Sequence, residues 1–202
     1  MFEDDFLDRE RSPADLEARA NGLRDLFRLG SQRRIDFVKL LEVELPELFP
    51  QFAVVPRSTA ELPGNFAITR FDPPRIEVRE DVWSAAGRFH PRAQVIASHE
   101  LAHLVTHGGQ PKSLKVGPQE HKTRSSIQRA MSVERHADDI GFYFLLPRRE
   151  LEKCHSLSEI VNDFSVPYKL AVRAKTEYRL RRIRKLQPYE VAHLLTAEED
   201  PF

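Results

Sequence analysis

The sequence predicts an α+β domain in which a small, mostly antiparallel sheet packs against several helices. Strand-like alternation is confined to residues 52–79, and apolar residues recur at helical spacing on both sides of this segment. The chain has 202 residues, of which 41% are hydrophobic, so it can bury one core but has no room for a second enzyme domain. We expect an N-terminal arm and helix in residues 1–31, a central domain in 32–150 and a C-terminal helical extension in 151–202.

The first helices are predicted to be scaffold. Ser12 can cap a helix with Pro13 at its first position, and apolar residues continue at helical spacing to Gly30. A second helix should begin near Gln32 and end before Pro46, because it carries a regular apolar period at Ile35, Val38, Leu41 and Leu45.

Short strands are predicted next, at residues 52–55, 65–69 and 75–79, with a turn at 71–74. In the last strand, one wet and one buried face are indicated by the alternation of Arg75, Glu77 and Arg79 with Ile76 and Val78. Further helices are expected near residues 91–107, 131–146, 157–163 and 167–185, and a polar stretch at 108–129 separates the first two of these.

Charge and cysteine content limit the compartment and the partners. Lys plus Arg and Asp plus Glu number 31 each, so no overall field draws the protein to nucleic acid or to an anionic membrane. Cys154 is the single cysteine, which excludes an intramolecular disulfide. The acidic N-terminal segment is unlike a secretory signal, and no apolar run reaches membrane-spanning length. We therefore expect a cytoplasmic protein.

His99, Glu100 and His103 form a His-Glu-x-x-His motif inside the helix expected at 91–107. Histidines at this spacing project from one face of a helix and can bind one metal ion. The glutamate between them can act as a general base toward a water molecule whose pKa is lowered by zinc. The motif therefore predicts a hydrolytic metal site with two ligands and a base.

A catalytic zinc site also needs a third protein ligand and an open position. The elongated version of the motif is excluded because Gly109 stands where it has a histidine. His107 lies on the same straight helix, which cannot wrap three such side chains around one ion, so packing or support of a ligand is its expected role. On the next helix Glu134 can be the third ligand and Asp138 can hydrogen-bond a ligand histidine, although such acids on an arbitrary helix are more often solvated.

These two helices resemble the paired motifs of the ImmA/IrrE family of bacterial metallopeptidases. Residues 134–147 match the family's Glu-x-x-Ala-Asn-x-Phe-Ala-x-x-Leu-Leu-Met-Pro, with conservative departures at Asp138, Ile140, Gly141 and Leu146. Gly141 would also let this helix approach its neighbour closely. Residues 76–82 look like the family's strand before the active helix, and the similarity extends over roughly residues 32–180.

The resemblance implies that residues 32–150 form a metallopeptidase domain in which His99, His103 and Glu134 bind zinc and Glu100 is the catalytic base. Manganese or iron also suits two histidines and one carboxylate. The family further implies a cytosolic protease that cleaves a helix-turn-helix repressor in a phage, mobile-element or stress response. The oxyanion donor stays open between Tyr143, His136, His107 and His121.

Other functions compete with proteolysis. A regulatory module could keep the metal site and grip a repressor or toxin partner without cleaving it, but such a module has no need of Glu100 as a base. DNA binding is a further alternative, because the helix at 167–185 carries a basic run, although this is more often a solvated helix face. If the protein is a protease, the alternating pattern near residues 64–79 suggests that its substrate pairs with the sheet edge there.

Overall fold

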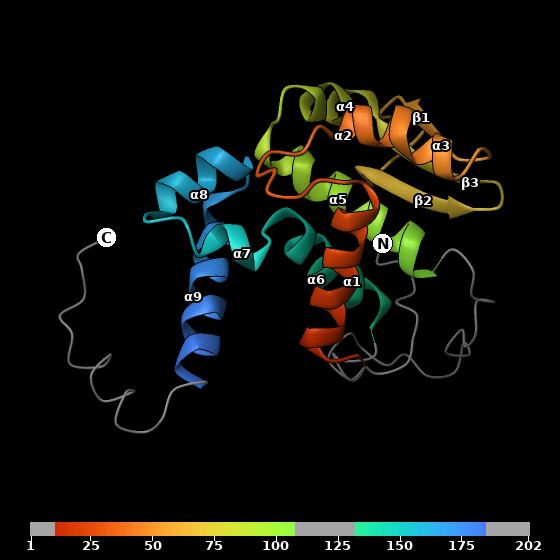
Figure 1. Ribbon diagram of the computed structural model, residues 1–202. Coiled ribbons are helices and arrows are strands. Elements are labelled where there is room, and N and C mark those ends of the chain that lie inside the picture. The colour runs from red at the N-terminus through yellow and green to blue at the C-terminus, as the bar shows by residue number, and fades with distance from the viewer. Residues whose placement is uncertain (1–10, 108–131, 185–202) are drawn as a thin grey trace, which may run out of the picture.

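The computed structural model in Figure 1 describes residues 11–107 and 132–184, and this part of the chain confirms the α+β class. A three-stranded sheet lies on one side of helix α5, and helices α6 and α1 lie on the other. In chain order the elements are α1 (Pro13–Leu26), α2 (Phe37–Lys39), η1 (Leu40–Glu44), α3 (Leu45–Leu48), β1 (Ala53–Arg57), β2 (Ala67–Phe71), β3 (Pro74–Arg79), α4 (Glu80–Gly87), α5 (Pro91–His107), α6 (Val133–Leu145), α7 (Arg148–Leu151), α8 (Leu157–Phe164) and α9 (Tyr168–Arg184).

Helix α1 begins as its capping residues predict. The Ser12 hydroxyl accepts a hydrogen bond from the Asp15 N–H, and the Asp15 carboxylate accepts one from the Ser12 N–H, which completes a capping box. The helix packs along α6 and ends at Leu26, four residues before the predicted end. Near its end the guanidinium of Arg24, only 3% exposed, donates to the main-chain oxygen of Phe144 at 2.8 Å.

The second helix differs from the prediction at both ends. It begins at Phe37 instead of near Gln32, with Asp36 as its cap, because the preceding arginines reach across to α8. Arg33 binds the Asp163 carboxylate at 2.6 Å and Arg34 donates to the Asn162 carbonyl at 2.7 Å. Helical backbone then continues through Pro46 to Leu48, because the π-helical segment η1 accommodates a residue that cannot donate the usual hydrogen bond.

The sheet is mixed, with strand order β1-β3-β2. Strands β2 and β3 pair antiparallel, as expected, whereas β1 and β3 pair parallel, so the sheet is not mostly antiparallel. Ile76 and Val78 of β3 are buried as the alternation predicts. Glu77 was expected on a wet face but is only 8% exposed, because arginines from all three strands gather over its carboxylate: Arg57, Arg70 and Arg75.

Two short helices were absent from the sequence prediction, α4 and α7. Residues 76–82 were expected to belong to one strand by resemblance. In the structure β3 ends at Arg79, and α4 begins at Glu80. Acidic residues in the first turn of a helix are favoured by its dipole, and Asp81 stands there, bonded to Arg79 at 2.6 Å. This helix fills the space between β3 and α5.

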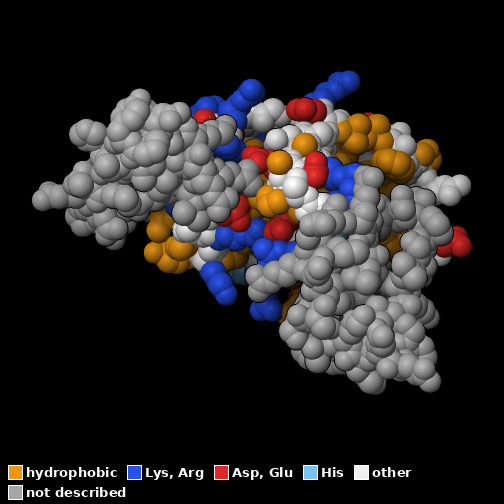
Figure 2. Space-filling view, turned by 90° about the horizontal axis from the view of Figure 1, so that it is seen from below, with side chains coloured by type: hydrophobic (Ala, Val, Ile, Leu, Met, Phe, Trp, Pro, Cys, Tyr) orange, Lys and Arg blue, Asp and Glu red, His pale blue; other side chains and the backbone are white. Residues whose placement is uncertain are grey.

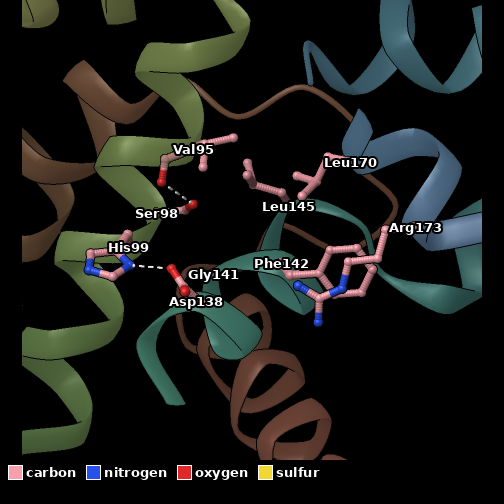
Figure 3. A pocket seen from close by; sticks show the side chains of 9 residues that line it. All are labelled: Val95, Ser98, His99, Asp138, Gly141, Phe142, Leu145, Leu170 and Arg173. Atoms are coloured by element: carbon pink, nitrogen blue, oxygen red, sulfur yellow. Dashed lines mark hydrogen bonds and ion pairs between the residues drawn. The ribbon is translucent and has the colours of Figure 1, made fainter. Parts of the chain in front are cut away.

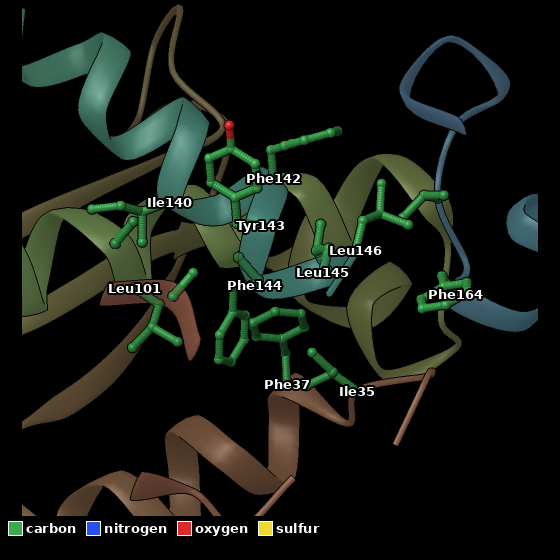
Figure 4. Packing of buried hydrophobic residues seen from close by; sticks show 14 of the residues in the cluster. Ile35, Phe37, Leu101, Ile140, Phe142, Tyr143, Phe144, Leu145, Leu146 and Phe164 are labelled. Carbon is green, nitrogen blue, oxygen red and sulfur yellow. The ribbon is translucent and has the colours of Figure 1, made fainter. Parts of the chain in front are cut away.

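The core lies where α6 packs against α5 and against α1. Figure 4 shows buried side chains of this core. Leu101 of α5 and Ile140 and Phe144 of α6 are each at most 1% exposed, and the ring of Phe37 lies 6.1 Å from that of Phe144. Burial of such side chains supplies the main stabilising free energy of the domain. The two helices that carry the motif residues therefore pack directly on each other in the core.

The last helices, α7 to α9, extend beyond the end of α6, and α9 packs against α7 and α8. Cys154, between α7 and α8, is a buried free thiol. Within residues 11–107 and 132–184, none of the helices has the length and apolar character needed to span a bilayer.

Candidate metal centre

Helix α5 presents His99 and His103 one turn apart on the side that faces α6. The Nε2 atoms of the two rings lie 2.9 Å apart. Leu101 and Ala102, between them in sequence, are each 1% exposed and hold the helix in the core. The apolar period therefore sets the rotation of α5, and this rotation points both imidazoles at the same space.

Glu134, in the first turn of α6, faces this pair of histidines. Its Oε2 lies 3.4 Å from Nε2 of His99 and its Oε1 lies 3.5 Å from Nε2 of His103. Ser132 caps α6 by accepting a hydrogen bond from the Arg135 N–H, which fixes the start of the helix and so the position of Glu134.

These three side chains form a group that could hold a metal ion, since one ligand atom from each lies within 4.8 Å of the others. Bonds of about 2.0–2.1 Å to a tetrahedral zinc ion would leave neighbouring ligand atoms about 3.3–3.4 Å apart. The separations of 2.9, 3.4 and 3.5 Å among His99, His103 and Glu134 bracket this value. Two imidazole nitrogens and a carboxylate also match the donor types that zinc, iron and manganese accept.

Asp138, one turn along α6 from Glu134, orients one of the histidines. Its Oδ1 lies 2.9 Å from Nδ1 of His99. Figure 3 marks this hydrogen bond with a dashed line. An ionised carboxylate can only accept, so Nδ1 of His99 carries the hydrogen. A neutral ring in this tautomer has its lone pair on Nε2, the atom that faces Glu134 and His103, which is the arrangement that metal binding requires.

In the metal-free protein, hydrogen bonds between the histidines and the carboxylates stabilise the group. Burial opposes the charged form of His99, but hydrogen bonds to Asp138 and Glu134 and the charge of Glu100 outweigh it and raise the pKa of the ring to about 10. Hydrogen bonds from His103 and His99 lower the pKa of the Glu134 carboxyl well below its usual range. The arrangement thus favours one positive charge between two carboxylates, a position that a metal cation can take over.

Glu100 points away from the solvent and toward the sheet. It is 7% exposed, and its Oε2 accepts a hydrogen bond of 2.7 Å from the hydroxyl of Thr69 on β2. The same hydroxyl lies 3.0 Å from the main-chain oxygen of Glu100. Sequence reasoning did not identify Thr69, because the contact joins residues 31 positions apart in different elements.

Gly141 brings α6 into direct contact with α5 beside the centre. A Cβ atom at this position would lie 3.1 Å from Oγ of Ser98 and 3.3 Å from the backbone nitrogen of His99. Real Cβ contacts are rarely this short. The expected close approach is therefore present, and it lies next to the His99–Asp138 hydrogen bond.

A cavity of about 230 Å³ lies beside this hydrogen bond, between α5, α6 and α9 (Figure 3). Its walls are largely apolar, with the His99–Asp138 pair on one side and an arginine on the other. The lining residues are Val95, Ser98, His99, Asp138, Gly141, Phe142, Leu145, Leu170 and Arg173. An apolar group at least as large as a benzene ring fits such a volume.

Arg173 fastens α9 to the helix that carries Glu134 and Asp138. Its guanidinium binds the Asp139 carboxylate, donates to Glu177 at 3.0 Å and lies 4.0 Å from the centre of the Phe142 ring. The Tyr143 hydroxyl also donates to Glu177, at 3.1 Å. The C-terminal extension is thus packed onto the back of the candidate centre.

Among the proposed oxyanion donors, the structure describes the side chains of Tyr143 and His136. Tyr143 is engaged with α9 as above, and His136 is fully buried inside α6, so neither faces the solvent next to the histidine pair. The side chain of His107 and all of His121 lie outside the described residues.

No protein-family model matches this sequence, and no curated protein matches it either. Within the described part of the chain, His99, His103 and Glu134 form a group that could bind a metal ion.

Proposed function

We propose that the protein is a zinc-dependent endopeptidase. The observation that carries the proposal is the convergence of His99, His103 and Glu134 from two packed helices, with Glu100 on the same helix as the histidines. Glutamate placed between two metal-binding histidines is the arrangement used for hydrolysis, whereas a site that only binds a metal has no need of it.

Each residue has a role in this proposal. His99, His103 and Glu134 hold the ion, and Asp138 keeps His99 in the tautomer that leaves Nε2 available. Bound zinc supplies a polarising charge for a substrate carbonyl and for a water molecule. Glu100 takes the proton of that water and passes it on toward the leaving amine.

The substrate would lie along β2. This strand is an edge of the sheet and packs against α5, so an extended peptide paired with it runs past Glu100. Arg70 lies on this edge strand, so it is a suitable site for a crosslinker, whereas Arg75 lies on the central strand β3. A photocrosslinker at position 70 should capture substrate, and the same group at Glu152, directly after α7, is the control.

The identity of the substrate is proposed from the motif resemblance alone. It suggests a cytoplasmic helix-turn-helix repressor whose cleavage induces phage, mobile-element or stress genes. Comparison of new protein N-termini in cells that express the wild type or Glu100→Gln would reveal such a substrate. A repressor fragment present only with the wild type is the expected result.

The side chains of α9 that the structure describes, up to Tyr178, give little support to DNA binding, and the basic side chains from Arg179 to Arg184 lie outside the described part. Arg173 is held by Asp139 and Glu177, and Lys175 donates to the Cys154 carbonyl at 3.2 Å. On the face in Figure 2, basic and acidic side chains of the described residues are mixed, with apolar side chains between them. Nucleic-acid binding usually requires a surface of one sign.

The first test is metal content, measured by elemental mass spectrometry on protein purified without chelators. The wild type should carry about one zinc ion per chain, and Glu134→Ala should carry far less. Glu152→Ala is the matched control, because Glu152 directly follows α7 and, among the residues that the structure describes, forms its ion pair with Arg148. Absence of metal from the wild type, even after zinc is supplied, would refute the proposal.

The second test separates catalysis from binding. Glu100→Gln should retain zinc but lose cleavage of a quenched-fluorescent peptide library, because the amide cannot accept the proton. If Glu100→Gln retains the biological activity of the wild type, the protein acts instead as a non-proteolytic module that grips its partner.

A further inference from the structure

Thr69 is a polar residue on the apolar face of the sheet. In the antiparallel register it pairs with Ile76, and its neighbours Ala67 and Val78 form the next pair on the same face. Ile76 and Val78 are only 2% and 3% exposed. Strand alternation therefore favours an apolar side chain at position 69, and valine has nearly the shape of threonine.

The hydroxyl of Thr69 donates a hydrogen bond to the carboxylate of Glu100. It has one hydrogen to donate, and the shorter of its two contacts is the 2.7 Å bond to Oε2 of the carboxylate. Hydrogen bonds to an ionised group are about twice as strong as neutral ones. Among the residues that the structure describes, no other side chain hydrogen-bonds this carboxylate, and Glu100 is 7% exposed.

A buried carboxylate held at one oxygen has a fixed rotation. With Oε2 bonded to Thr69, the plane of the Glu100 carboxylate is set by the edge strand and not by α5 alone. The second oxygen, Oε1, is then left to serve as a base. Proton transfer in a transition state depends steeply on such alignment.

We propose that Thr69 is a positioning residue, whose hydroxyl holds one carboxylate oxygen of Glu100 so that the other can accept the proton of the attacking water. This rests on the proposed peptidase function. Thr69 touches neither the substrate nor the ion in this role. It joins the base to the same strand along which the substrate would lie.

The test compares Thr69→Val, which keeps the shape, with Thr69→Ser, which keeps the hydroxyl. Both variants and the wild type are loaded with zinc and assayed on the best substrate from the quenched-fluorescent peptide library. Thr69→Val should lower kcat by roughly ten- to a hundredfold, with KM and zinc content unchanged. Thr69→Ser should stay within about threefold of the wild type, since it can still donate. If Thr69→Val does not fold, Thr69→Ala takes its place.

Each outcome decides one point. A wild type that cleaves and a Thr69→Val variant with the same kcat overturn the role of Thr69 but leave the peptidase function standing. Equal losses in Thr69→Val and Thr69→Ser also overturn it, because they indicate a packing effect. If the zinc-loaded wild type cleaves nothing, the peptidase function fails, and crystal structures of zinc-loaded wild type and Thr69→Val then test the positioning. A Glu100 carboxylate rotated in the variant supports it, and an unchanged one overturns it.

Discussion

Replacement of Gly141 by alanine tests whether the candidate metal centre depends on the close packing of α5 and α6. The added Cβ would lie 3.1 Å from Oγ of Ser98 and 3.3 Å from the His99 nitrogen, below the 3.4–4 Å of ordinary contact. The Ser98 hydroxyl can rotate away, but the helix backbone cannot. The two helices must therefore move apart by a few tenths of an ångström.

The expected cost follows from two opposing effects. Overpacking of a tight contact costs about 1–3 kcal/mol, while alanine is favoured over glycine within a helix by roughly 0.5–1 kcal/mol. The free energy of unfolding of Gly141→Ala should therefore fall by on the order of 1 kcal/mol. Asp138 lies on the same helix, so its 2.9 Å bond to His99 should lengthen, and zinc affinity should drop by about tenfold.

Urea unfolding of the metal-free protein measures the first quantity, and competition with a zinc chelator measures the second. Gly22→Ala is the matched control, because its Cβ would meet no atom within 4 Å and it lies inside helix α1. This control should gain roughly 0.5–1 kcal/mol and bind zinc as the wild type does. If Gly141→Ala behaves like Gly22→Ala in both assays, the argument that close packing positions His99 is wrong.

Four further perturbations test the candidate centre and the contacts that support α6. Zinc binding at pH 7.5 should release about one proton per chain, because His99 has a pKa of about 10 in the metal-free protein; calorimetry in buffers of different ionisation heat measures this, and no release would contradict it. In metal-free protein, the raised pKa of His99 adds to the free energy of unfolding. This contribution is complete below pH 6.5, the ordinary pKa of histidine, and is lost as the pH rises through about 10. The lowered pKa of Glu134 makes a contribution that is present above pH 4.5 and is lost on acidification. Asp138→Ala should weaken zinc binding by about 10–100-fold, and Asp138→Asn less because its amide oxygen can still accept, so equal losses would argue against the hydrogen bond. Arg24→Met should lower the free energy of unfolding by about 2–4 kcal/mol, because buried carbonyl groups such as that of Phe144 lose their charged donor; a urea midpoint equal to that of the wild type would refute this.

Features set by local sequence were predictable. The Ser12 cap is a contact between residues three apart, and the spacing of His99 and His103 on a helix places both rings on one face without reference to the rest of the fold. The positions of Glu134 and Asp138 on α6 follow from the same periodicity. The buried face of β3 was also predictable, because alternation reports directly on one strand.

Features set by distant contacts were not predictable. The start of the second helix depends on where Arg33 finds Asp163, which lies 130 residues away. The parallel pairing of β1 with β3 depends on which edge of the β2–β3 hairpin β1 meets. The bond between Thr69 and Glu100 needs both the sheet and α5 in place, and a threonine in a strand carries no signal of it.

Helix α6 is held by residues from both ends of the chain: Arg24 of α1 donates to its Phe144 carbonyl, and Arg173 of α9 binds its Asp139 carboxylate. A chain break between α5 and α6 would leave His99 and His103 on the fragment with α1, and Glu134 on the fragment with α9. Fragments 1–107 and 132–202 should reassemble, with α1 docking on α6 across the break. Since each fragment would bring part of the donor group, a split form of this protein could report zinc through its own association.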